Sequence, residues 1–541
     1  MTMEADFVIV GGGSAGCVLA NRLSADPTVR VVLLEAGGRD SNFLYKMPAG
    51  FFALMKAGMG NYNYDTVPQP HCDNRVLYFP RGKVLGGSSS INGLVVSRGN
   101  PGDYDHWADL GNAGWSYQDC LPYFKRLESF PAGDPAVRGH NGPIGVTRTP
   151  LEAMNPITRG WLKGGQQAGY PFIDDVNAGD PYGMSQMQGN YANAARQSSS
   201  ASYLKPVLNR PNLTVITGAL TKQVLLEGAR AVGVEYLQRG RVQTVRAQRE
   251  VILSAGCVNS PQILQLSGIG DPDELRGHGI RVQRELPGVG RNLKDHPAVS
   301  VKHLATKPYS LLSSLKPLAL VKGLAQYLLF GSGEASVGGL EAWAHLKSSP
   351  DLSYPDLQLY CVPLLYNDHG RDVVQKEGFQ VVLNAARPKS MGSVKLRSAD
   401  PAAAPLIDLG FLSDPDDLRV LRAGIRQTRE IFAQSALDDF RGEEYAPGAG
   451  VVSDADLDAY IRANVNSIYH PVGTCKMGSD PMAVVDAELR VHGVNGLRVV
   501  DASVMPDIIS GNTNFPTMMV AERAAELILG TQSTSFNRAA H

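Results

Sequence analysis

A histidine that directly precedes a proline is the residue of this sequence best placed for acid–base chemistry. His470 lies in the segment Ile468–Thr474 and is followed by Pro471. Proline biases the residue before it toward extended backbone, so we expect His470 on a loop or strand end. Neutral imidazole titrates near neutral pH, which suits a general base. A hydrogen-bonded structural histidine is the alternative, and the histidine taken alone favours it.

A polar loop near the C-terminus offers hydrogen-bond donors. It covers residues 510–517, carries Asn512 and Asn514, and precedes a helix predicted to open at Met518. Amide side chains and free helix N–H groups can bind a polar or anionic ligand. An ordinary helix cap is the alternative, and the loop taken alone favours it.

A glycine-rich turn close to the N-terminus has the spacing of a dinucleotide site. Gly11 permits a tight turn, Gly13 lets the backbone approach a pyrophosphate, and Gly16 lets a helix pack on a strand. Glu35 follows nineteen residues after Gly16, where its carboxylate can accept hydrogen bonds from a ribose. The spacing predicts a bound dinucleotide but does not separate FAD from NAD. A glycine turn without a ligand is the alternative.

Regular elements must position these residues. Apolar runs predict a strand at 7–10, a helix at 17–23 and a strand at 29–34, which together form the unit that the glycine turn requires. Residues 212–255 predict a three-stranded antiparallel insert, and residues 300–480 alternate strands and helices without a cofactor signature. The insert strands are expected at 213–216, 232–236 and 242–245, ahead of a buried strand at 250–256.

Composition excludes several classes of function. The 541 residues carry 51 basic and 52 acidic side chains, so the chain lacks the excess of positive charge that is typical of nucleic-acid-binding proteins. The six cysteines are scattered without a CxxC pair, and no HxH or HExxH motif occurs, so we expect buried free thiols, no disulfide framework and no metal site. We see no secretory signal and no apolar stretch of spanning length, so we expect a cytoplasmic protein.

Several long motifs in order make the chain resemble the glucose–methanol–choline (GMC) oxidoreductases, from about residue 5 to 530. Within that family it is most similar to bacterial alcohol, sorbose and polyethylene glycol dehydrogenases, and less so to choline dehydrogenases. The motifs are GGGSAG at 11–16, PRGKVLGGSSSING at 80–93, SAGCVNSPQILQLSGIG at 254–270, PGVGRNLKDH at 287–296, YHPVGTCKMG at 469–478, and RVVDASVMP followed by GNTNFPT.

The resemblance implies an α/β fold in which a Rossmann-like FAD-binding domain is interleaved with a substrate domain. The substrate domain is expected to be α+β, with helices on an antiparallel sheet. Residues 1–300 would be mainly FAD-binding, with parts of 110–200 on the substrate side. Residues 301–480 would bind substrate, 481–530 would return to the FAD-binding domain, and 531–541 would form a polar, frayed tail.

The resemblance also implies that the dinucleotide is FAD. Isoleucine at position 91, where family members with covalent flavin can carry histidine, predicts a dissociable cofactor. Cys257 departs from the small residue usual in its motif, and we expect it to be structural. The residues expected around FAD are Gly11, Gly13, Ser14, Ala15, Gly16, Glu35, Ala36, Arg81, Leu85, Gly87, Ser88, Asn92, Gly93, Leu94, Val95, Thr221, Ala255, Gly256, Asp501, Ala502, Asn512, Phe515, Pro516 and Thr517.

The implied reaction is oxidation of a primary aliphatic or aromatic alcohol to an aldehyde or ketone. His470 matches the catalytic histidine of the family and would take the hydroxyl proton, while hydride passes to flavin N5. Asn514 matches the second catalytic position and would hydrogen-bond the developing alkoxide. We expect flavin reduction to accelerate with pH through one ionisation near neutrality. An oxygen-using oxidase, a non-redox lyase and a flavin-binding protein without catalysis remain alternatives.

Partners follow from this chemistry. The expected ones are a small-molecule alcohol and an electron acceptor, which would be a quinone, a dye-like molecule, a protein carrier or oxygen. The apolar, lysine-bearing segment 309–330 is favoured as a buried helix of the substrate domain. Its alternative is an amphipathic lid that admits apolar alcohols or contacts the inner face of a membrane.

Overall fold

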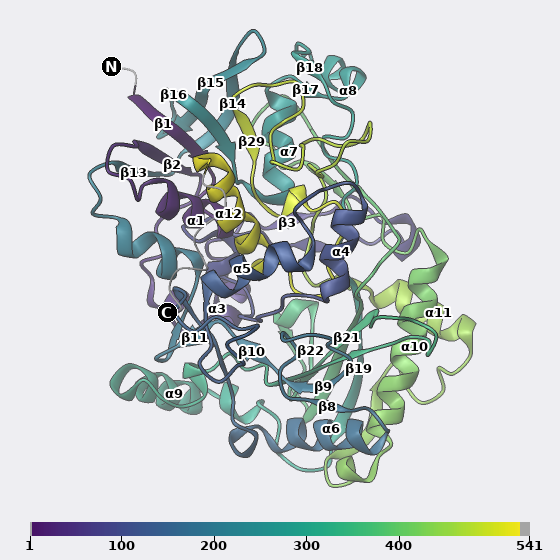
Figure 1. The fold of residues 1–541 in the computed structure, drawn as a ribbon. Coiled ribbons are helices and arrows are strands. Elements are labelled where there is room, and N and C mark those ends of the chain that lie inside the picture. The colour runs from purple at the N-terminus through teal and green to yellow at the C-terminus, as the bar shows by residue number, and fades with distance from the viewer. Residues whose placement is uncertain (1–2, 531–541) are drawn as a thin grey trace.

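A seven-stranded sheet organises the first half of the computed structural model, which describes residues 3–530 (Figure 1). Strands β13, β2, β1, β16 and β29 run parallel, and β15 and β14 continue the sheet antiparallel from β16. The predicted α/β class and the first strand–helix–strand unit are confirmed. The strands are β1 (Met3–Val10), β2 (Val31–Glu35), β13 (Leu213–Thr217), β14 (Leu220–Glu227), β15 (Arg230–Gln238), β16 (Arg241–Leu253) and β29 (Leu497–Val499).

The insert predicted over 212–255 was wrong in its membership. Strand β13 pairs in parallel with β2, so it belongs to the main sheet, and the strand that follows it in the chain, β14, is the one that pairs with β15. The third insert strand and the buried strand after it are one strand, β16. Its first half pairs with β15 and its second half with β29, while β1 runs along both. No glycine or proline interrupts residues 241–253, so nothing in that run ends the strand.

Helices pack against this sheet, and the glycine turn lets the first of them, α1, lie close to β1. Helix α1 starts after Gly13, and a Cβ added at Gly16 would lie 1.8 Å from the carbonyl oxygen of Gly11, so only glycine fits there. Helix α12 packs on α1, and its buried Glu522 forms an ion pair with Arg22 at 2.7 Å. Helix α12 begins at Asn514, four residues earlier than the sequence predicted. The helices of this half include α1 (Ser14–Leu23), α4 (Pro101–Asp109), α5 (Tyr117–Leu127), α7 (Gly256–Leu266), α8 (Pro272–Gly277) and α12 (Asn514–Leu529).

The second sheet is antiparallel for most of its width and lies in the other half of the molecule (Figure 1). Its strand order in the described residues is β27-β19-β24-β21-β20-β9-β8, with β28 paired to β19. The strands are β8 (Phe172–Ile173), β9 (Gly183–Gln186), β19 (Pro297–Ala305), β20 (Ala342–Leu346), β21 (Leu357–Val362), β24 (Gly378–Ala385), β27 (Arg441–Ala446) and β28 (Asn466–Ser467). Its members thus come from 172–186 and from 297–467. The domain boundaries expected from the sequence stay a prediction.

Three helices cover one face of the second sheet. They are α6 (Pro156–Gln167), α10 (Pro415–Phe432) and α11 (Asp454–Asn464). Helix α10 has Asp414 as its N-cap, proline at its first position and a buried apolar stripe that includes Leu421 and Ile425. Side chains alternate along the strands, so Val299 and Val301 of β19 enter the core beneath the helices. Ser300, which lies between them, faces the other way, toward the space between the two sheets.

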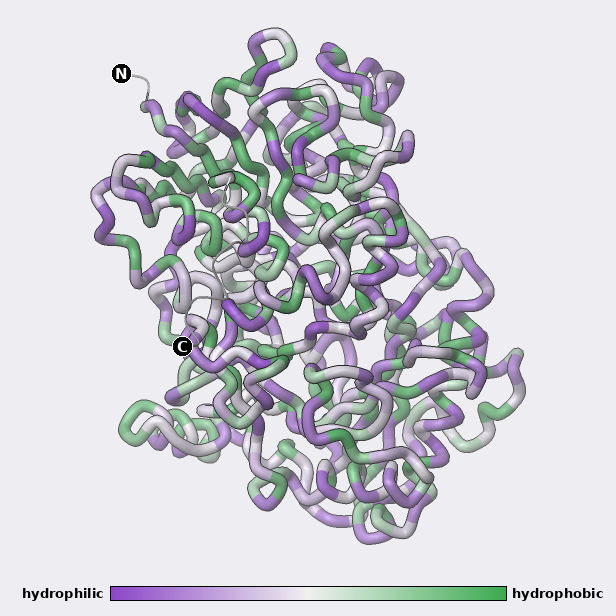
Figure 2. Tube along the Cα trace, in the orientation of Figure 1, coloured by the Kyte–Doolittle hydropathy of each residue, from purple (hydrophilic) through white to green (hydrophobic). Residues whose placement is uncertain are grey.

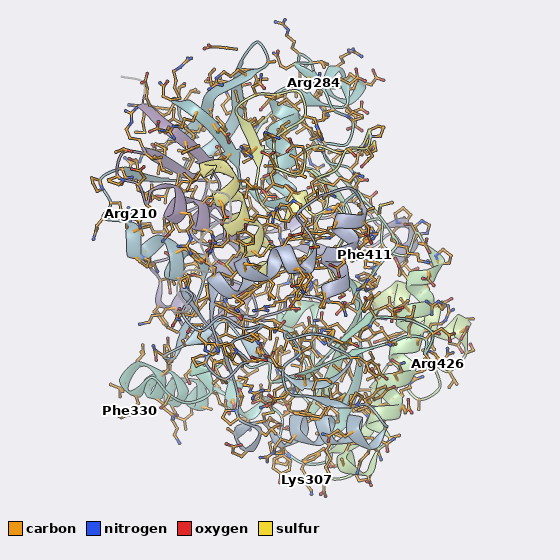
Figure 3. The ribbon with its side chains drawn as sticks, viewed as in Figure 1. Arg210, Arg284, Lys307, Phe330, Phe411 and Arg426 are labelled. Carbon is orange, nitrogen blue, oxygen red and sulfur yellow. The ribbon has the colours of Figure 1, made fainter. Side chains whose placement is uncertain are left out.

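Helix α9 (Pro317–Phe330) overturns the expectation of a buried helix for 309–330. Leu318 is 83% exposed, Leu329 74% and Phe330 76%, and Tyr327 is the one buried residue within the helix. The helix projects from the body of the protein, with hydrophobic colouring along it and Phe330 at its periphery (Figures 2 and 3). An apolar pattern is common to buried and unpartnered helices, and among the described residues of α9 most of the large apolar side chains are exposed. Between residues 3 and 530, no helix is both long and apolar enough to cross a bilayer.

Candidate active site

A cavity of about 500 Å³ lies between the two sheets, at the carboxyl ends of β1 and β2. Val10 and Leu34, at the ends of those strands, form part of its wall. Ala298, Tyr360 and Val382 of the second sheet form the opposite part. Crevices at the carboxyl ends of parallel strands are where open α/β sheets bind ligands.

Most of the residues expected from the sequence line this cavity. Gly16, Leu85, Leu94, Phe515 and Pro516 lie outside its wall: Gly16 serves the packing of α1, and the other four are buried in the surrounding structure. The expected residues that do line it are Gly11, Gly13, Ser14, Ala15, Glu35, Ala36, Arg81, Gly87, Ser88, Asn92, Gly93, Val95, Thr221, Ala255, Gly256, His470, Asp501, Ala502, Asn512, Asn514 and Thr517.

Glu35 marks one end of the cavity. Its two carboxylate oxygens accept hydrogen bonds from the backbone N–H of Gly12 at 2.8 Å and of Gly37 at 2.7 Å. Burial raises the pKa of this carboxyl to about 7. Each oxygen keeps a free lone pair for a further donor. Thr221 lies in the same cavity, and its buried hydroxyl has no partner among the described residues. These acceptors and donors suit the hydroxyls of a ribose and the edge of an adenine.

The glycine turn leaves room for a diphosphate. Gly11 has φ of +101°, and a Cβ there would lie 2.4 Å from the Ser254 carbonyl oxygen. A Cβ added at Gly13 would meet no atom closer than 3.9 Å, so the space beside this residue is open. No side chain of residues 3–530 caps the N-terminus of α1. Its N–H groups and dipole therefore favour an anion, and the cavity fits the pyrophosphate of FAD.

At the other end, two histidines fix the protonation state of the candidate base. His296 Nε2 lies 3.1 Å from the carbonyl oxygen of Ala386, which can only accept, so this nitrogen carries the proton. His296 Nδ1 is then an acceptor, and His470 Nδ1–H donates to it at 2.9 Å. His470 Nε2 is left with a lone pair, which accepts from Asn512 Nδ2 at 3.0 Å. His470 therefore presents an unprotonated Nε2, as a base must.

Burial keeps both imidazoles neutral. It lowers the pKa of His296 to about 4. Burial, together with the nearby His296 and Arg81, lowers the pKa of His470 well below its ordinary range. The ionisation that the sequence led us to expect near neutrality therefore moves toward acid pH, because desolvation disfavours the charged imidazolium. The base form of His470 is populated at neutral pH.

A buried aspartate holds the backbone at this histidine. Asp295 Oδ1 accepts from the N–H groups of His296 at 2.8 Å and His470 at 2.7 Å, and its other oxygen accepts from the Ser467 hydroxyl. Burial raises the pKa of Asp295 to about 6. Asp295 thus positions both histidines. Cys257 lies against the same segment, and its buried thiol donates to the Pro471 carbonyl at 2.7 Å.

The two loop asparagines have different neighbours. Asn512 lies against His470, and its Oδ1 lies 3.0 Å from the Tyr360 hydroxyl, whose single proton also faces Gln358 Oε1 at 2.6 Å. Asn514 instead accepts at Oδ1 from the Ser14 hydroxyl at 2.8 Å, and its buried Nδ2 has no partner among the described residues. Because Ser14 opens α1, Asn514 belongs beside the diphosphate end of the cavity. The carboxamide beside the base is that of Asn512.

Sequence reasoning missed several residues of this end. His296, Asp295 and Tyr360 were not among the expected site residues. The motif at 287–296 ends in Asp295-His296 and was the available signal for two of them. Tyr360 has no motif, since only the pairing of β21 into the second sheet brings it to Asn512.

Comparison with known proteins finds relatives that match almost the whole chain. Two profiles described as GMC oxidoreductase match residues 5–298 and 388–521. The chain is 46% identical to choline dehydrogenase, mitochondrial, of Mus musculus, covering 97% of this chain and 90% of that protein. It is 45% identical to oxygen-dependent choline dehydrogenase of Brucella anthropi, covering 98% and 96%.

Solved structures resemble the whole chain. Pyridoxine 4-oxidase from Mesorbium loti has a TM-score of 0.89 at 30% identity, covering 98% of this chain and 100% of that one. A formate oxidase of Aspergillus oryzae RIB40, in a study of FAD modification, has a TM-score of 0.92 at 28% identity, covering 98% of each.

Proposed function

The chain belongs to the GMC oxidoreductase family, and we propose that it is an FAD-dependent dehydrogenase that oxidises a primary aliphatic or aromatic alcohol to the aldehyde. The observation that carries the proposal is the neutral His470, whose unprotonated Nε2 faces Asn512 in the cavity that suits FAD. The same reaction on a secondary alcohol would give a ketone.

Four side chains act on the alcohol or position the groups that do. The substrate hydroxyl replaces Asn512 Nδ2, which lies 3.0 Å from His470 Nε2, as the hydrogen-bond donor to that nitrogen. Nε2 then takes the hydroxyl proton as the carbinol hydrogen leaves as hydride. The amide of Asn512 donates to the developing alkoxide, and the Tyr360 hydroxyl lies against the oxygen of that amide. His296 accepts from Nδ1–H throughout, which keeps the imidazole oriented. FAD, when bound, accepts the hydride.

Anaerobic mixing of the yellow holoenzyme with alcohols tests this function. The panel comprises short and long aliphatic alcohols, benzyl alcohol, a polyol and choline. We expect at least one class to bleach the flavin, and His470→Ala to slow bleaching at least about 100-fold, which is the lower range for a lost general base, while FAD stays bound. Bleaching at the wild-type rate in this variant would refute the role of His470. Failure of every alcohol would refute alcohol oxidation and leave a flavin-binding protein or a lyase.

The electron acceptor is addressed by readmitting air to the reduced enzyme. We propose a dehydrogenase that passes electrons to a quinone, a dye-like molecule or a protein carrier. Slow return of the yellow colour in air and rapid return with a quinone would support this. Rapid return in air would make the enzyme an oxidase. The proteins that this chain resembles include both an oxygen-dependent choline dehydrogenase and a pyridoxine 4-oxidase, so they leave this choice to experiment.

For helix α9 we propose peripheral contact with an anionic membrane surface, at the cytoplasmic face. Leu318, Leu329 and Phe330 offer exposed apolar side chains, and Lys316 and Lys322 supply positive charge on the same helix and its cap. We expect the holoenzyme to pellet with phosphatidylglycerol vesicles and less with phosphatidylcholine vesicles. Replacing Leu329 and Phe330 with serine should abolish pelleting, and replacing the exposed Leu529 should not. No pelleting at low salt would reject the contact.

A further inference from the structure

Arg196 is a buried arginine, 2% exposed, that has no carboxylate partner among residues 3–530. Its hydrogen bonds all start from Nη1. They go to the carbonyl oxygens of Asn92 at 2.7 Å and Ser89 at 3.3 Å, and to Asn92 Oδ1 at 2.8 Å. Its Nε and Nη2 are buried and have no partner in the described part of the chain. Burial lowers the pKa of Arg196 to about 9, so the guanidinium still carries its charge at neutral pH.

A short hairpin brings this arginine to the wall of the cavity. Its strands are β11 (Tyr191–Ala192) and β12 (Ala195–Arg196), which pair antiparallel. The backbone of residues 188–190 bonds to that of residues 94–96 in both directions, with N···O distances of 2.9 Å. Because these bonds hold the hairpin against the wall segment, the guanidinium lies directly behind Asn92.

The segment that contains Asn92 lines the cavity from the diphosphate end to the base end. Gly87 lies at the diphosphate end, because a Cβ added there would lie 2.7 Å from the Cα of Gly13. Val95 belongs to the buried cluster of Tyr360, at the base end. A cofactor whose diphosphate binds at the glycine turn and whose ring reaches the base must therefore pass Asn92.

The amide of Asn92 is oriented from behind by two donors. Its Oδ1 accepts from Arg196 Nη1 and from the Leu94 N–H at 3.1 Å, and neither of these groups can accept a hydrogen bond. Its Nδ2 donates to no described residue, so it is available to a ligand in the cavity that Asn92 lines. At ordinary bond lengths, a ligand atom bonded to Nδ2 lies within about 8 Å of Arg196 Nη1. Salt screens charges weakly over that distance in a buried site.

We propose that Arg196 acts from behind Asn92 as the positive charge that favours the reduced form of FAD. Hydride carries a negative charge, so a flavin that accepts it becomes an anion until a proton follows. A buried cation that lacks a counter-ion in the protein stabilises this anion and is stabilised by it. The proposal goes beyond the proposed function, because it concerns FAD and does not depend on which alcohol is oxidised.

Three substitutions of Arg196 separate its charge from its size. Arg196→Met is apolar, Arg196→Gln is polar but uncharged, and Arg196→Lys keeps the charge. Equilibration of the FAD-loaded proteins with redox dyes, without any alcohol, measures the equilibrium constant of two-electron reduction. We expect Arg196→Met and Arg196→Gln to lower this constant at least tenfold, which makes the potential about 30 mV more negative. Arg196→Lys should stay within about threefold of the wild type, since both side chains are positively charged.

Arg210 provides a matched control at the edge of the molecule (Figure 3). Its Nη1 also donates to uncharged acceptors, the Asn21 carbonyl oxygen at 2.6 Å and the Ser24 hydroxyl at 2.9 Å. Arg210→Met removes a positive charge away from the cavity, so it should leave the equilibrium constant unchanged.

The outcomes that would overturn the proposal are specific. An unchanged constant in Arg196→Met would do so, and weaker FAD binding with an unchanged constant would assign the charge to the diphosphate instead. If Arg196→Met does not retain FAD, Arg196→Gln and Arg196→Lys decide the question, and equal constants in these two would refute a role for the charge. Since no alcohol is present, either result leaves the proposed alcohol oxidation to its own test.

Discussion

The imidazole of His470 is held in one tautomer by a chain of hydrogen bonds. The Ala386 carbonyl sets the proton on His296, and His296 in turn sets the proton on His470. Asp295 holds the backbone at both histidines. At this scale, the sequence could nominate His470 from its proline neighbour, but the protonation state required its contacts.

The lowered pKa of His470 predicts the pH dependence of the reductive step. A histidine that stays neutral at neutral pH loses base function only when the pH falls through its lowered pKa. We expect the rate of flavin reduction at saturating alcohol to be level between about pH 7 and pH 8.5 and to fall at acid pH. Stopped-flow anaerobic mixing across this range measures it. A rise through an ionisation above pH 7 would contradict the assignment.

Replacing the two loop asparagines one at a time distinguishes a residue that acts in flavin reduction from one that helps to bind FAD. Asn512→Leu should slow flavin reduction by about 10²- to 10³-fold with little change in FAD affinity, because a donor to the alkoxide is lost. Asn514→Leu should weaken FAD binding through the lost contact with Ser14 and leave the rate of the loaded enzyme closer to wild type. Titration of apo-protein with FAD and stopped-flow reduction distinguish the two. The reverse pattern would return the alkoxide role to Asn514, as the sequence had suggested.

Buried charge connects segments that secondary structure leaves separate. Glu128, after α5, accepts from Arg98 at 2.6 Å and from Arg138 at 2.7 Å, and all three side chains are 1% exposed or less. Arg138 continues the cluster to Asp175 at 2.7 Å, just after β8. Despite burial, the two guanidinium groups lower the pKa of Glu128.

Removing that carboxylate should destabilise the fold. We expect Glu128→Gln to lower the free energy of unfolding by about 3–5 kcal/mol, because two buried cations lose a partner. Since the pKa of Glu128 is lowered in the fold, its contribution is present above the unfolded-state value and disappears as pH falls through the folded-state pKa. Urea unfolding at neutral and acid pH measures both effects. The exposed pair of Arg246 and Glu227 is the control, where Glu227→Gln should change stability by less than about 1 kcal/mol. An equal loss in both variants would contradict the argument.

At the scale of the whole molecule, the cavity between the two sheets links cofactor binding to stability. One wall comes from the parallel sheet and the glycine turn, and the other from the antiparallel sheet. A ligand that binds there contacts both halves and stabilises the folded state by mass action. The comparisons identify that ligand as FAD.

Removal of FAD should therefore lower the melting temperature, and its return should restore it. Because position 91 is isoleucine, we expect acid ammonium sulfate to release the flavin without a covalent remnant. Free FAD at 100 times its Kd should stabilise the apo-protein by about 2.7 kcal/mol. Scanning calorimetry with FAD, and with NAD as the control, measures this. Flavin that stays with the denatured chain would show covalent attachment, and equal stabilisation by NAD would contradict the cofactor preference.

Local signals in the sequence determined the glycine turn, the first strand–helix–strand unit and the family, because turn geometry and apolar periodicity depend on neighbours in the chain. They also selected His470. The tertiary structure alone decided that Asn512 rather than Asn514 meets this histidine, since the loop turns the first amide toward His470 and the second toward Ser14. It also decided the exposure of α9 and the position of Arg196 behind the cavity wall. Exposure and contact depend on which distant elements pack together, and a local pattern of apolar or charged residues does not specify those elements.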